Sequence, residues 1–472
     1  MQRVEDSEEI IERVAAIDVG KAEVVVCIRI PDPARPGRRQ QEIVHSSTLT
    51  PRLLVLADRL VELGVTRVVM EATSDYWKPV FYLLESRGLD PWLVNARNVK
   101  HLPGRPKTDR LDAVWLAKVA ERQMLRPSFV PPGPIRLLRD LTRYRAGLVK
   151  VRTAEKNRVE KLLEDAQIKL SSVVSDIFGV SGREMLAALL AGERRPTVLA
   201  QLARTRMRPK IPLLEEAFVG QFTEHHAFLL RLMLARIDEA GADIAALEDR
   251  IRQLVAPFAT VVTRLHEIPG VGATAAWTVI AEIGLDMSRF PTPAHLSSWA
   301  RFAPGVNQSA GKTKGRGATG HGNRYLGQAL GEAAVAAAHT HTFLGDRFRR
   351  LARRRGGPRA TVAVGRSILV IIGLAPAVPA RRPLPRPGPG LHPPPRRPES
   401  RHPQPRPAPR SPRLRRHPHT RRPRLTNPDP SRRDHSRSRR GRPCPSPTDF
   451  RISGWDLSAD TFFEIEDQDV FH

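Results

Sequence analysis

Short apolar runs alternate with amphipathic stretches along the first part of the chain. The runs are rich in β-branched residues and predict four strands, at Val14–Gly20, Val24–Ile30, Arg67–Ala72 and Trp92–Ala96. Apolar residues recur at helical spacing in Leu53–Leu63 and Leu111–Leu125. Strands that begin as a hairpin and then alternate with helices indicate a mixed α/β sheet. We assign this sheet to a domain of residues 11–130.

Long helical patterns dominate residues 131–257. Residues 135–165 form one such pattern, with Leu141, Tyr144, Leu148 and Val151 on one face. In residues 230–255, apolar side chains lie alternately four and three residues apart, as in a coiled-coil seam: Met233, Ile237, Ala240, Ile244, Leu247, Ile251 and Leu254. Two interpretations fit these patterns. The helices form either an antiparallel hairpin that reaches across a partner or pairs subunits, or a bundle that packs on itself.

A third unit, mostly helical, is predicted for residues 258–373. It holds an apolar helix within Leu265–Gly284, then a stretch rich in Gly, Lys and Arg, and then an Ala-rich helix from about Tyr325 to His339. Residues 374–472 are of low complexity, and Pro and Arg are by far their commonest residues up to about residue 445. Such a composition buries too little apolar surface to offset chain entropy, so we expect a disordered tail.

The 472-residue chain is strongly basic, with a formal charge of +28. Residues 381–445 contribute +17 and residues 446–472 contribute −6, which leaves +17 for the other 380 residues. The body of the chain is therefore basic in its own right, and a polyanion such as nucleic acid is the expected partner.

Other classes of protein are excluded or disfavoured. Two cysteines, Cys27 and Cys444, exclude a disulfide-stapled scaffold and a four-cysteine zinc site. The N-terminus is acidic where a signal peptide would be cationic and apolar. The longest apolar run, residues 367–380, is shorter than the roughly 20 residues of a bilayer span. We expect a cytoplasmic protein without a membrane partner.

Four acidic residues are candidates for metal binding. Asp18 and Glu71 lie near the ends of predicted strands, and Asp109 and Asp112 share one face at the start of a predicted helix. Carboxylates without His or Cys suit a hard ion such as Mg²⁺ or Mn²⁺, and a metal pair can cleave a phosphodiester. The alternative is that the strand-end acids are solvated turn residues and that the helix acids favour the helix N-terminus.

Several segments resemble a known family. AAIDVGK around Asp18, VVMEATSDYW around Glu71, VNARNVK, and KTDRLDA, which holds Asp109 and Asp112, resemble the N-terminal domain of the DEDD transposases of the insertion-sequence-110 family. In that family this domain is similar to the RuvC resolvase and has an RNase H-like fold. IPGVGATAAWTVIAEIG and the stretch from Phe290 to Leu330 resemble the family's second, transposase domain. The resemblance covers about residues 11–373 and implies that the four acids are catalytic metal ligands.

The predicted C-terminal unit holds the other candidate residues. Gly270 and Gly272 in IPGVG resemble the hairpin of helix-hairpin-helix modules, whose backbone N–H groups bind phosphate, although a plain helix connection fits as well. Gly311-Lys312-Thr313 is no P-loop, because Val306 stands where that motif needs Gly.

Ser309 in NQSAGK is the candidate nucleophile. A serine in such a loop is ordinarily only solvated, although a phosphate bound beside it would lower the cost of developing charge. The cations that would hold that phosphate are Lys312, Lys314 and Arg316. The resemblance implies that Ser309 attacks DNA.

The resemblance implies the function of an insertion-sequence transposase. Such a recombinase cleaves and rejoins DNA with a metal through a phosphoserine intermediate. It is guided by a structured bridge RNA, acts on double-stranded donor and target DNA as a dimer to tetramer, and works at the prokaryotic nucleoid. One alternative is a RuvC-like, metal-dependent junction endonuclease without a covalent intermediate; another is a nucleic-acid-binding protein without catalysis. The basic helix 135–165 is either an RNA or phosphate contact or a solvated face.

The chain departs from the family pattern after SILVIIGLAP, where a closing helix is expected. A frameshift near Gly373 in a GC-rich gene explains residues 374–472, because shifted GC-rich codons favour Arg, Pro, Ala and Gly. The alternative is a true basic tail that binds nucleic acid non-specifically. Translation of the neighbouring reading frame distinguishes the two.

Overall fold

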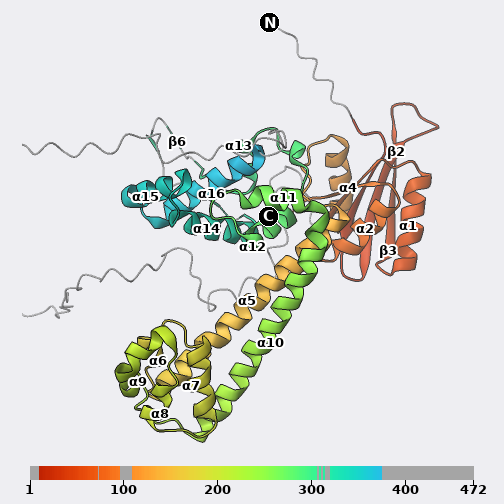
Figure 1. The fold of residues 1–472 in the computed structure, drawn as a ribbon. Coiled ribbons are helices and arrows are strands. Elements are labelled where there is room, and N and C mark those ends of the chain that lie inside the picture. The colour runs from red at the N-terminus through yellow and green to blue at the C-terminus, as the bar shows by residue number, and fades with distance from the viewer. Residues whose placement is uncertain are drawn as a thin grey trace, which may run out of the picture.

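The fold has three parts joined by two long helices (Figure 1). The computed structural model describes residues 10–374, apart from residues 73, 96–108, 306–307, 310–311, 314–318 and 321. A sheet domain lies at one end, a helical domain lies beside the base of the long helices, and a small bundle lies at their far end (Figure 1). The predicted tail beyond Leu374 lies outside the described residues.

The N-terminal domain is built on a mixed sheet with the strand order β3-β2-β1-β4-β5. Its strands are β1 (Val14–Val19), β2 (Glu23–Pro31), β3 (Arg39–Ser47), β4 (Arg67–Ala72) and β5 (Asp90–Leu93). β1 pairs antiparallel with β2 and parallel with β4, so the predicted mixed α/β sheet is confirmed. β3 was not predicted; it is a polar edge strand in which no residue is fully buried.

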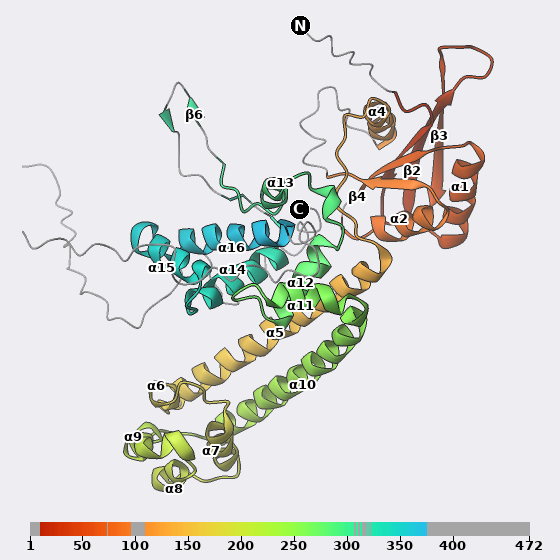
Figure 2. The ribbon, with the colours of Figure 1, turned by 45° about the horizontal axis from the view of Figure 1, so that its top comes forward.

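Helices cover both faces of this sheet. Successive side chains of a strand point to opposite faces. Ile17 and Met70 therefore pack against α1 (Thr50–Glu62) and α2 (Trp77–Ser86), whereas Ala16 and Val69 pack against α4 (Asp109–Glu121). Figure 2 shows α4 on the side of the sheet opposite α2. Alternate residues of each strand can thus be assigned to one face of the sheet or the other.

The two long helices form an antiparallel pair, as the hairpin interpretation predicted. They are α5 (Gly133–Asp165) and α10 (Glu224–Val255), which lie side by side in Figures 1 and 2. Of the seven residues of the predicted seam of α10, Ile237, Ala240, Ile244 and Ile251 are buried and the other three are half-buried, and the coiled-coil geometry stays a prediction.

The face predicted for α5 is wrong. Tyr144 is 61% exposed and Val151 is 53% exposed. The buried residues are instead Ile135, Leu138, Thr142, Glu155, Val159, Leu162 and Leu163. The reason is that α5 packs on different partners along its length, first on α12 (Ala273–Ile283), then on α10, and finally on the distal bundle. Its buried face therefore shifts around the helix.

A distal bundle, which was not predicted, fills the chain between α5 and α10. It consists of α6 (Leu170–Val173), α7 (Val180–Leu190), α8 (Pro196–Gln201), the 3-10 helix Thr205–Lys210 and α9 (Ile211–Ala217). Met185, Leu186 and Leu214 are fully buried in its core, which also includes Val159 and Leu230 of the long helices. The bundle interpretation is thus correct for this end of the pair.

The C-terminal domain is mostly helical, as predicted. Besides α12 it contains the 3-10 helices Ala256–Phe258 and Met287–Arg289, then α11 (Ala259–His266), α13 (Pro293–Trp299), α14 (Arg324–Ala338), α15 (Phe343–Arg355) and α16 (Gly357–Leu374). By length and composition α16 is apolar enough to cross a membrane. Its residues Val364, Ile368 and Leu369 are fully buried against other helices of the C-terminal domain.

Candidate active site

Two of the predicted acids are neighbours in the sheet. Asp18 on β1 and Glu71 on β4 are paired in register across the parallel strands. Adjacent strands lie roughly 4.8 Å apart, and residues in register point to the same face. Asp18 lies two residues after Ala16, and Glu71 lies two residues after Val69. Both acids therefore point to the face that α4 covers. Two half-buried carboxylates therefore lie side by side beneath α4.

The last residue of α4, the helix that begins with the other two acids, is anchored near the start of β1. That residue, Glu121, accepts a backbone hydrogen bond from Ile11, just before β1. The Glu121 carboxylate also binds Arg29 at 2.8 Å and Arg39 at 2.7 Å. The end of α4 is thus held at the start of β1.

The lengths of the two elements agree with this placement. Thirteen helical residues span about 18 Å, and the strand from Val14 to Asp18 spans about 13 Å. The first turn of α4, which holds Asp109 and Asp112, is thus at the end of the helix away from the start of β1. Asp112 is half-buried; of Asp109 only the backbone is described.

The donor set at this edge fits a hard divalent cation. All four residues offer carboxylate oxygens, which Mg²⁺ and Mn²⁺ prefer. Two carboxylates in register on adjacent strands can share one bound cation. Among the side chains that the structure describes, which exclude Asp109, no three His, Cys, Asp or Glu already form a metal cluster.

Ser309 lies in the C-terminal domain, apart from the acids. It belongs to β6 (Gln308–Ser309), which pairs with β7 (Lys312–Thr313), and Lys312 is the register partner of Ser309. Both ribbon views show β6 far from the sheet of the N-terminal domain (Figures 1 and 2). The structure thus brings Ser309 next to Lys312 but not next to the acids. Lys314 and Arg316 lie outside the described residues.

Two family models match the parts of the chain that hold these residues. Residues 15–168, with all four acids, match the DEDD transposase model of IS110, and residues 262–349, with Ser309, match the transposase family IS116/IS110/IS902. The chain is an IS110-family transposase.

Two relatives extend the similarity over most of their own length. A 43.6 kDa protein of insertion element IS110 from Streptomyces coelicolor is 26% identical over 312 residues, which cover 61% of this chain and 75% of that protein. The transposase for insertion sequence element IS1111A from Coxiella burnetii is 28% identical over 321 residues, which cover 66% of this chain and 78% of that protein.

The glycines predicted to bind phosphate differ in their surroundings in this IS110-family transposase. Gly270 has a positive φ of 89°, and an added Cβ would lie 2.1 Å from the backbone oxygen of Ala333 in α14. Glycine is therefore required there by close packing on α14. Gly272 caps the N-terminus of α12, with open space where a Cβ would lie. Phosphate binding by either residue stays a prediction.

A buried ionic network that was not predicted from the sequence ties three helices of the transposase together. Glu282 on α12 is fully buried, and the two oxygens of its carboxylate accept hydrogen bonds from Arg143 of α5 at 2.9 Å each. Asn323 donates to the same carboxylate at 2.6 Å and also caps the N-terminus of α14. Arg139 lies 3.4 Å from the Glu282 carboxylate and donates to the last backbone carbonyls of α12.

The charges of this network are mutually stabilised. Burial on its own would raise the pKa of Glu282, but the hydrogen bonds and charge of Arg143, with Arg139 and Asn323, outweigh it and hold the pKa below its usual value. Burial lowers the pKa of Arg139 to about 10, so this guanidinium stays charged at neutral pH. Because Asn323 ends the segment that begins with β6, the network joins the Ser309 region to the base of α5.

We expect Glu282→Gln to lower the free energy of unfolding by about 3 kcal/mol at pH 7, because it leaves Arg143 and Arg139 without their buried counter-charge. A carboxyl group with a depressed pKa stabilises the fold above its unfolded value of 4.5, and this contribution is lost as the pH falls through the folded pKa. The difference from wild type should therefore shrink in acid. Denaturant unfolding at several pH values measures it, with the exposed Glu239→Gln on α10 as control. Equal stability at pH 7 would contradict the network's role.

Proposed function

We propose that this IS110-family transposase cleaves and rejoins DNA strands with Ser309 as nucleophile. A divalent metal, Mg²⁺ or Mn²⁺, would be held by Asp18, Glu71, Asp109 and Asp112. The observation that carries the proposal is the in-register pair Asp18 and Glu71 on the face of the sheet that α4 covers. The match to the DEDD transposase model supports a divalent metal, and the transposase name of the Coxiella relative supports DNA as substrate.

Each residue has a defined part in the proposed reaction. The Ser309 hydroxyl oxygen attacks the phosphorus, forming an ester bond while the bond from phosphorus to the departing strand breaks. The departing oxygen takes up the proton that the serine gives up, so that strand leaves with a free hydroxyl. Lys312, opposite Ser309 in the hairpin, holds the phosphate. The bound metal supplies polarisation of the scissile phosphate. Because the phosphoserine ester conserves bond energy, a strand hydroxyl can reverse the attack and rejoin the DNA.

The separation of Ser309 from the acids supports an oligomer as the active form. In one copy, β6 and the sheet lie at opposite sides of the C-terminal helices (Figures 1 and 2). A joint site needs either a large rearrangement of one chain or the acids of one copy with the serine of another. A dimer or tetramer supplies the second arrangement without unfolding the network around Glu282.

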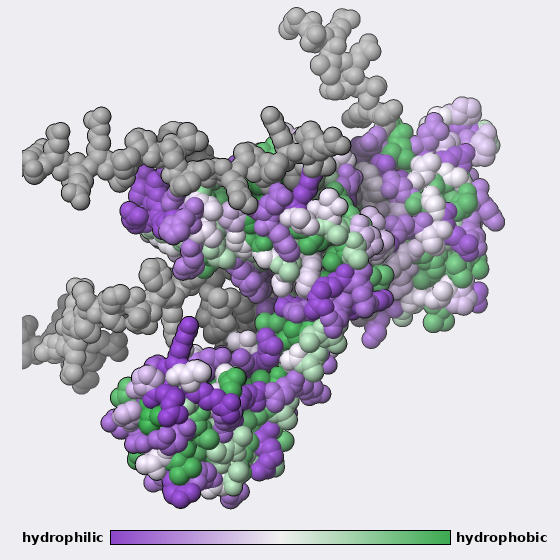
Figure 3. Space-filling view, in the orientation of Figure 1, coloured by the Kyte–Doolittle hydropathy of each residue, from purple (hydrophilic) through white to green (hydrophobic). Residues whose placement is uncertain are grey.

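The nucleic-acid partners are donor DNA, target DNA and a structured bridge RNA. α15 offers a phosphate-binding surface, which is strongly hydrophilic in Figure 3. Four of its arginines are exposed, at Arg350, Arg353, Arg354 and Arg355, and none makes an ion pair with a described acid. Arginine suits phosphate because its planar fork donates two parallel hydrogen bonds. We assign α15 to contact with the backbone of duplex DNA.

Replacing Arg353, Arg354 and Arg355 together by Gln should weaken DNA binding and reduce its salt dependence. Each lost phosphate contact lowers the slope of log K against log salt by about 0.9, so the slope should fall by roughly 2 to 3. Binding titrations at several salt concentrations measure the slope. The control removes the same charge elsewhere, at the exposed residues Arg206, Arg208 and Arg231. Equal slopes for the two triple variants would contradict the assignment of α15.

The proposed function is tested by incubating the wild-type chain with labelled donor and target DNA and the element's flanking RNA. With Mg²⁺ we expect a covalent protein–DNA adduct on a denaturing gel and rejoined product. With EDTA in place of Mg²⁺ both should disappear, because the substrate phosphate is no longer polarised. Cleavage that persists in EDTA would contradict the metal site. Cleavage without any adduct would favour the junction endonuclease.

A further inference from the structure

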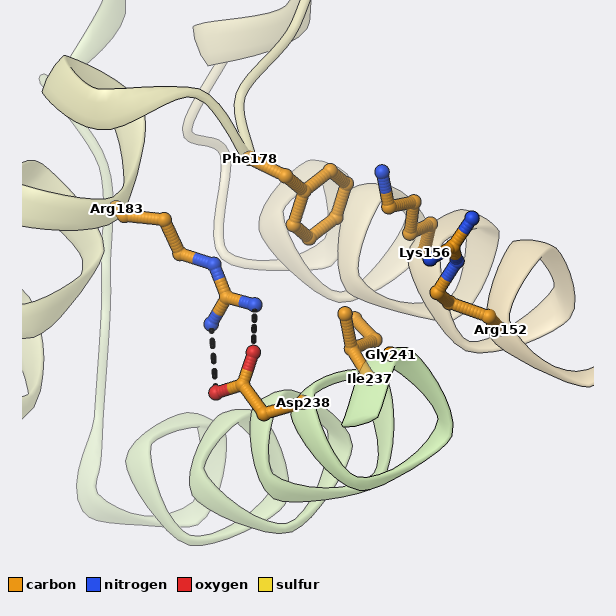
Figure 4. A pocket seen from close by; sticks show the side chains of 7 residues that line it. All are labelled: Arg152, Lys156, Phe178, Arg183, Ile237, Asp238 and Gly241. Atoms are coloured by element: carbon orange, nitrogen blue, oxygen red, sulfur yellow. Dashed lines mark hydrogen bonds and ion pairs between the residues drawn. The ribbon is translucent and has the colours of Figure 1, made fainter. Parts of the chain in front are cut away.

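A hollow of about 270 Å³ lies where the distal bundle meets the two long helices (Figure 4). Arg152 and Lys156 line it from α5, Phe178 lines it from the segment before α7, and Ile237 and Gly241 line it from α10. Its volume lies just below the roughly 300–1,000 Å³ of pockets for drug-sized ligands, so a small ligand fits. The hollow belongs neither to the acid cluster nor to the Ser309 hairpin.

The charge on the walls favours an anion. Arg183 of α7 is neutralised, because both of its terminal nitrogens bind the Asp238 carboxylate, one of them at 3.3 Å (Figure 4). Arg152 and Lys156 are one helical turn apart and make no ion pair with an acid among the described residues. Like charges at this spacing repel each other, and a bound anion would offset that repulsion.

The wall also carries an aromatic ring. Phe178 is only half-buried, and the Lys156 ammonium lies 4.8 Å from its ring centroid. Figure 4 shows the ring between Arg183 on one side and Lys156 and Arg152 on the other. Proteins bind single-stranded nucleic acids with a cation next to an accessible aromatic ring, because a base stacks on the ring while its phosphate meets the cation.

A glycine keeps the hollow open. Gly241 lies in the middle of α10 with an ordinary helical backbone, and an added Cβ would meet nothing within 4 Å. Glycine in a helix interior is less stable than alanine, and neither crowding nor a positive φ requires it here. A larger side chain at this position would project into the space.

We infer that this hollow binds one nucleotide of a single strand of nucleic acid. Its phosphate lies on Arg152 and Lys156 and its base lies against Phe178. The inference rests on the proposed role of nucleic acid as partner of this transposase, but it needs neither the serine chemistry nor the metal site. It therefore holds or fails by binding alone, and a Ser309→Ala chain serves for the test.

The test uses the full-length Ser309→Ala chain and single-stranded probes of about 10 nucleotides. One probe is oligo-dT with a central 4-thiothymidine and the other is oligo-U with a central 4-thiouridine. Irradiation followed by peptide mapping should locate the crosslink in the peptide that contains Phe178. Gly241→Leu, which fills the hollow, and the pair Arg152→Gln with Lys156→Gln should each reduce this crosslink about tenfold.

The controls are matched to each change. Gly147→Leu alters a mid-helix glycine of α5 that is equally uncrowded but does not line the hollow, and Arg206→Gln with Arg231→Gln removes the same charge. Both should leave the crosslink unchanged. If these variants lose the crosslink with both probes, the site contacts the phosphate and the base. If they lose it with the U probe alone, the site also contacts the ribose. Either result supports the proposal. If circular dichroism shows that Gly241→Leu is misfolded, the Arg152 and Lys156 pair decides.

Three results would overturn the site: crosslinks that map elsewhere, equal losses in the control variants, or equally effective competition by duplex DNA. Overturning it leaves the proposed function standing if the wild-type chain still forms adducts with DNA. A chain that binds none of the single-stranded or duplex probes would instead remove the proposed function as well.

Discussion

A Ser309→Ala chain is expected to form no covalent protein–DNA adduct and to lose strand rejoining by at least about a thousandfold, as loss of a nucleophile does in serine enzymes. The physical reason is that the alanine methyl group has no oxygen to form the phosphoester bond. Adducts are scored on denaturing gels with labelled donor DNA, Mg²⁺ and the element's RNA. DNA affinity should stay within about twofold of wild type, because one neutral hydroxyl contributes little to backbone binding.

The matched control for Ser309→Ala is Ser298→Ala, which removes an exposed serine from α13 in the same domain. Ser297 is less suitable, because it is buried and its hydroxyl donates to the backbone oxygen of Pro293 at 3.0 Å. Adduct formation that survives Ser309→Ala would show that another residue is the nucleophile. Cleavage that survives without any adduct would identify a hydrolytic junction endonuclease.

Asp18→Asn and Glu71→Gln should each reduce cleavage by at least about a thousandfold while DNA binding is retained. Each change keeps the shape of the side chain but removes one negative charge from the in-register pair. A hard cation then loses a carboxylate ligand, and its affinity falls. A second measurement does not depend on activity: added Mn²⁺ should raise the melting temperature of wild type, because a ligand that binds only the folded state stabilises it. The two variants should lose that rise.

Glu62→Gln provides the control for these acids, since Glu62 is an exposed carboxylate at the end of α1. Full activity in Asp18→Asn would exclude β1 from the active site and favour the interpretation of Asp18 as a solvated strand-end residue. A protein that binds nucleic acid without catalysis predicts that the acids are dispensable, so this pair of variants tests that alternative too.

The sheet and the position of its acids could be predicted because buried strands produce continuous apolar runs. β1 and β4 are covered on both faces, so their sequences stand out, and the acids that interrupt each run near its end are visible at once. β3 escaped prediction because an edge strand needs few apolar residues. What the sequence alone did not show is the register between β1 and β4, which is the feature that places Asp18 beside Glu71.

The other features could not be predicted because they depend on contacts between residues that are far apart in the sequence. The buried face of α5 was mispredicted because periodicity within a helix cannot show that its partners change along its length. Glu282 appears in the sequence as one acid in an apolar helix, but its partners Arg143 and Asn323 are far away along the chain. The backbone register places Ser309 of β6 opposite Lys312 of β7, a pairing that the sequence did not show, and the distance of Ser309 from the acids depends on the arrangement of whole domains.

The antiparallel helices also fix a length. The 33 residues of α5 span about 50 Å. At 3.4 Å per base pair this equals about 15 base pairs of duplex DNA. The distal bundle is thus held at one fixed distance from the domains that carry Ser309 and the acids. A mobile element whose transposase is this chain would therefore be constrained in the spacing of its DNA sites as well as in their sequence. Inserting half a helical turn of DNA between the cleavage point and a site that the distal bundle contacts should disrupt cleavage and that contact together.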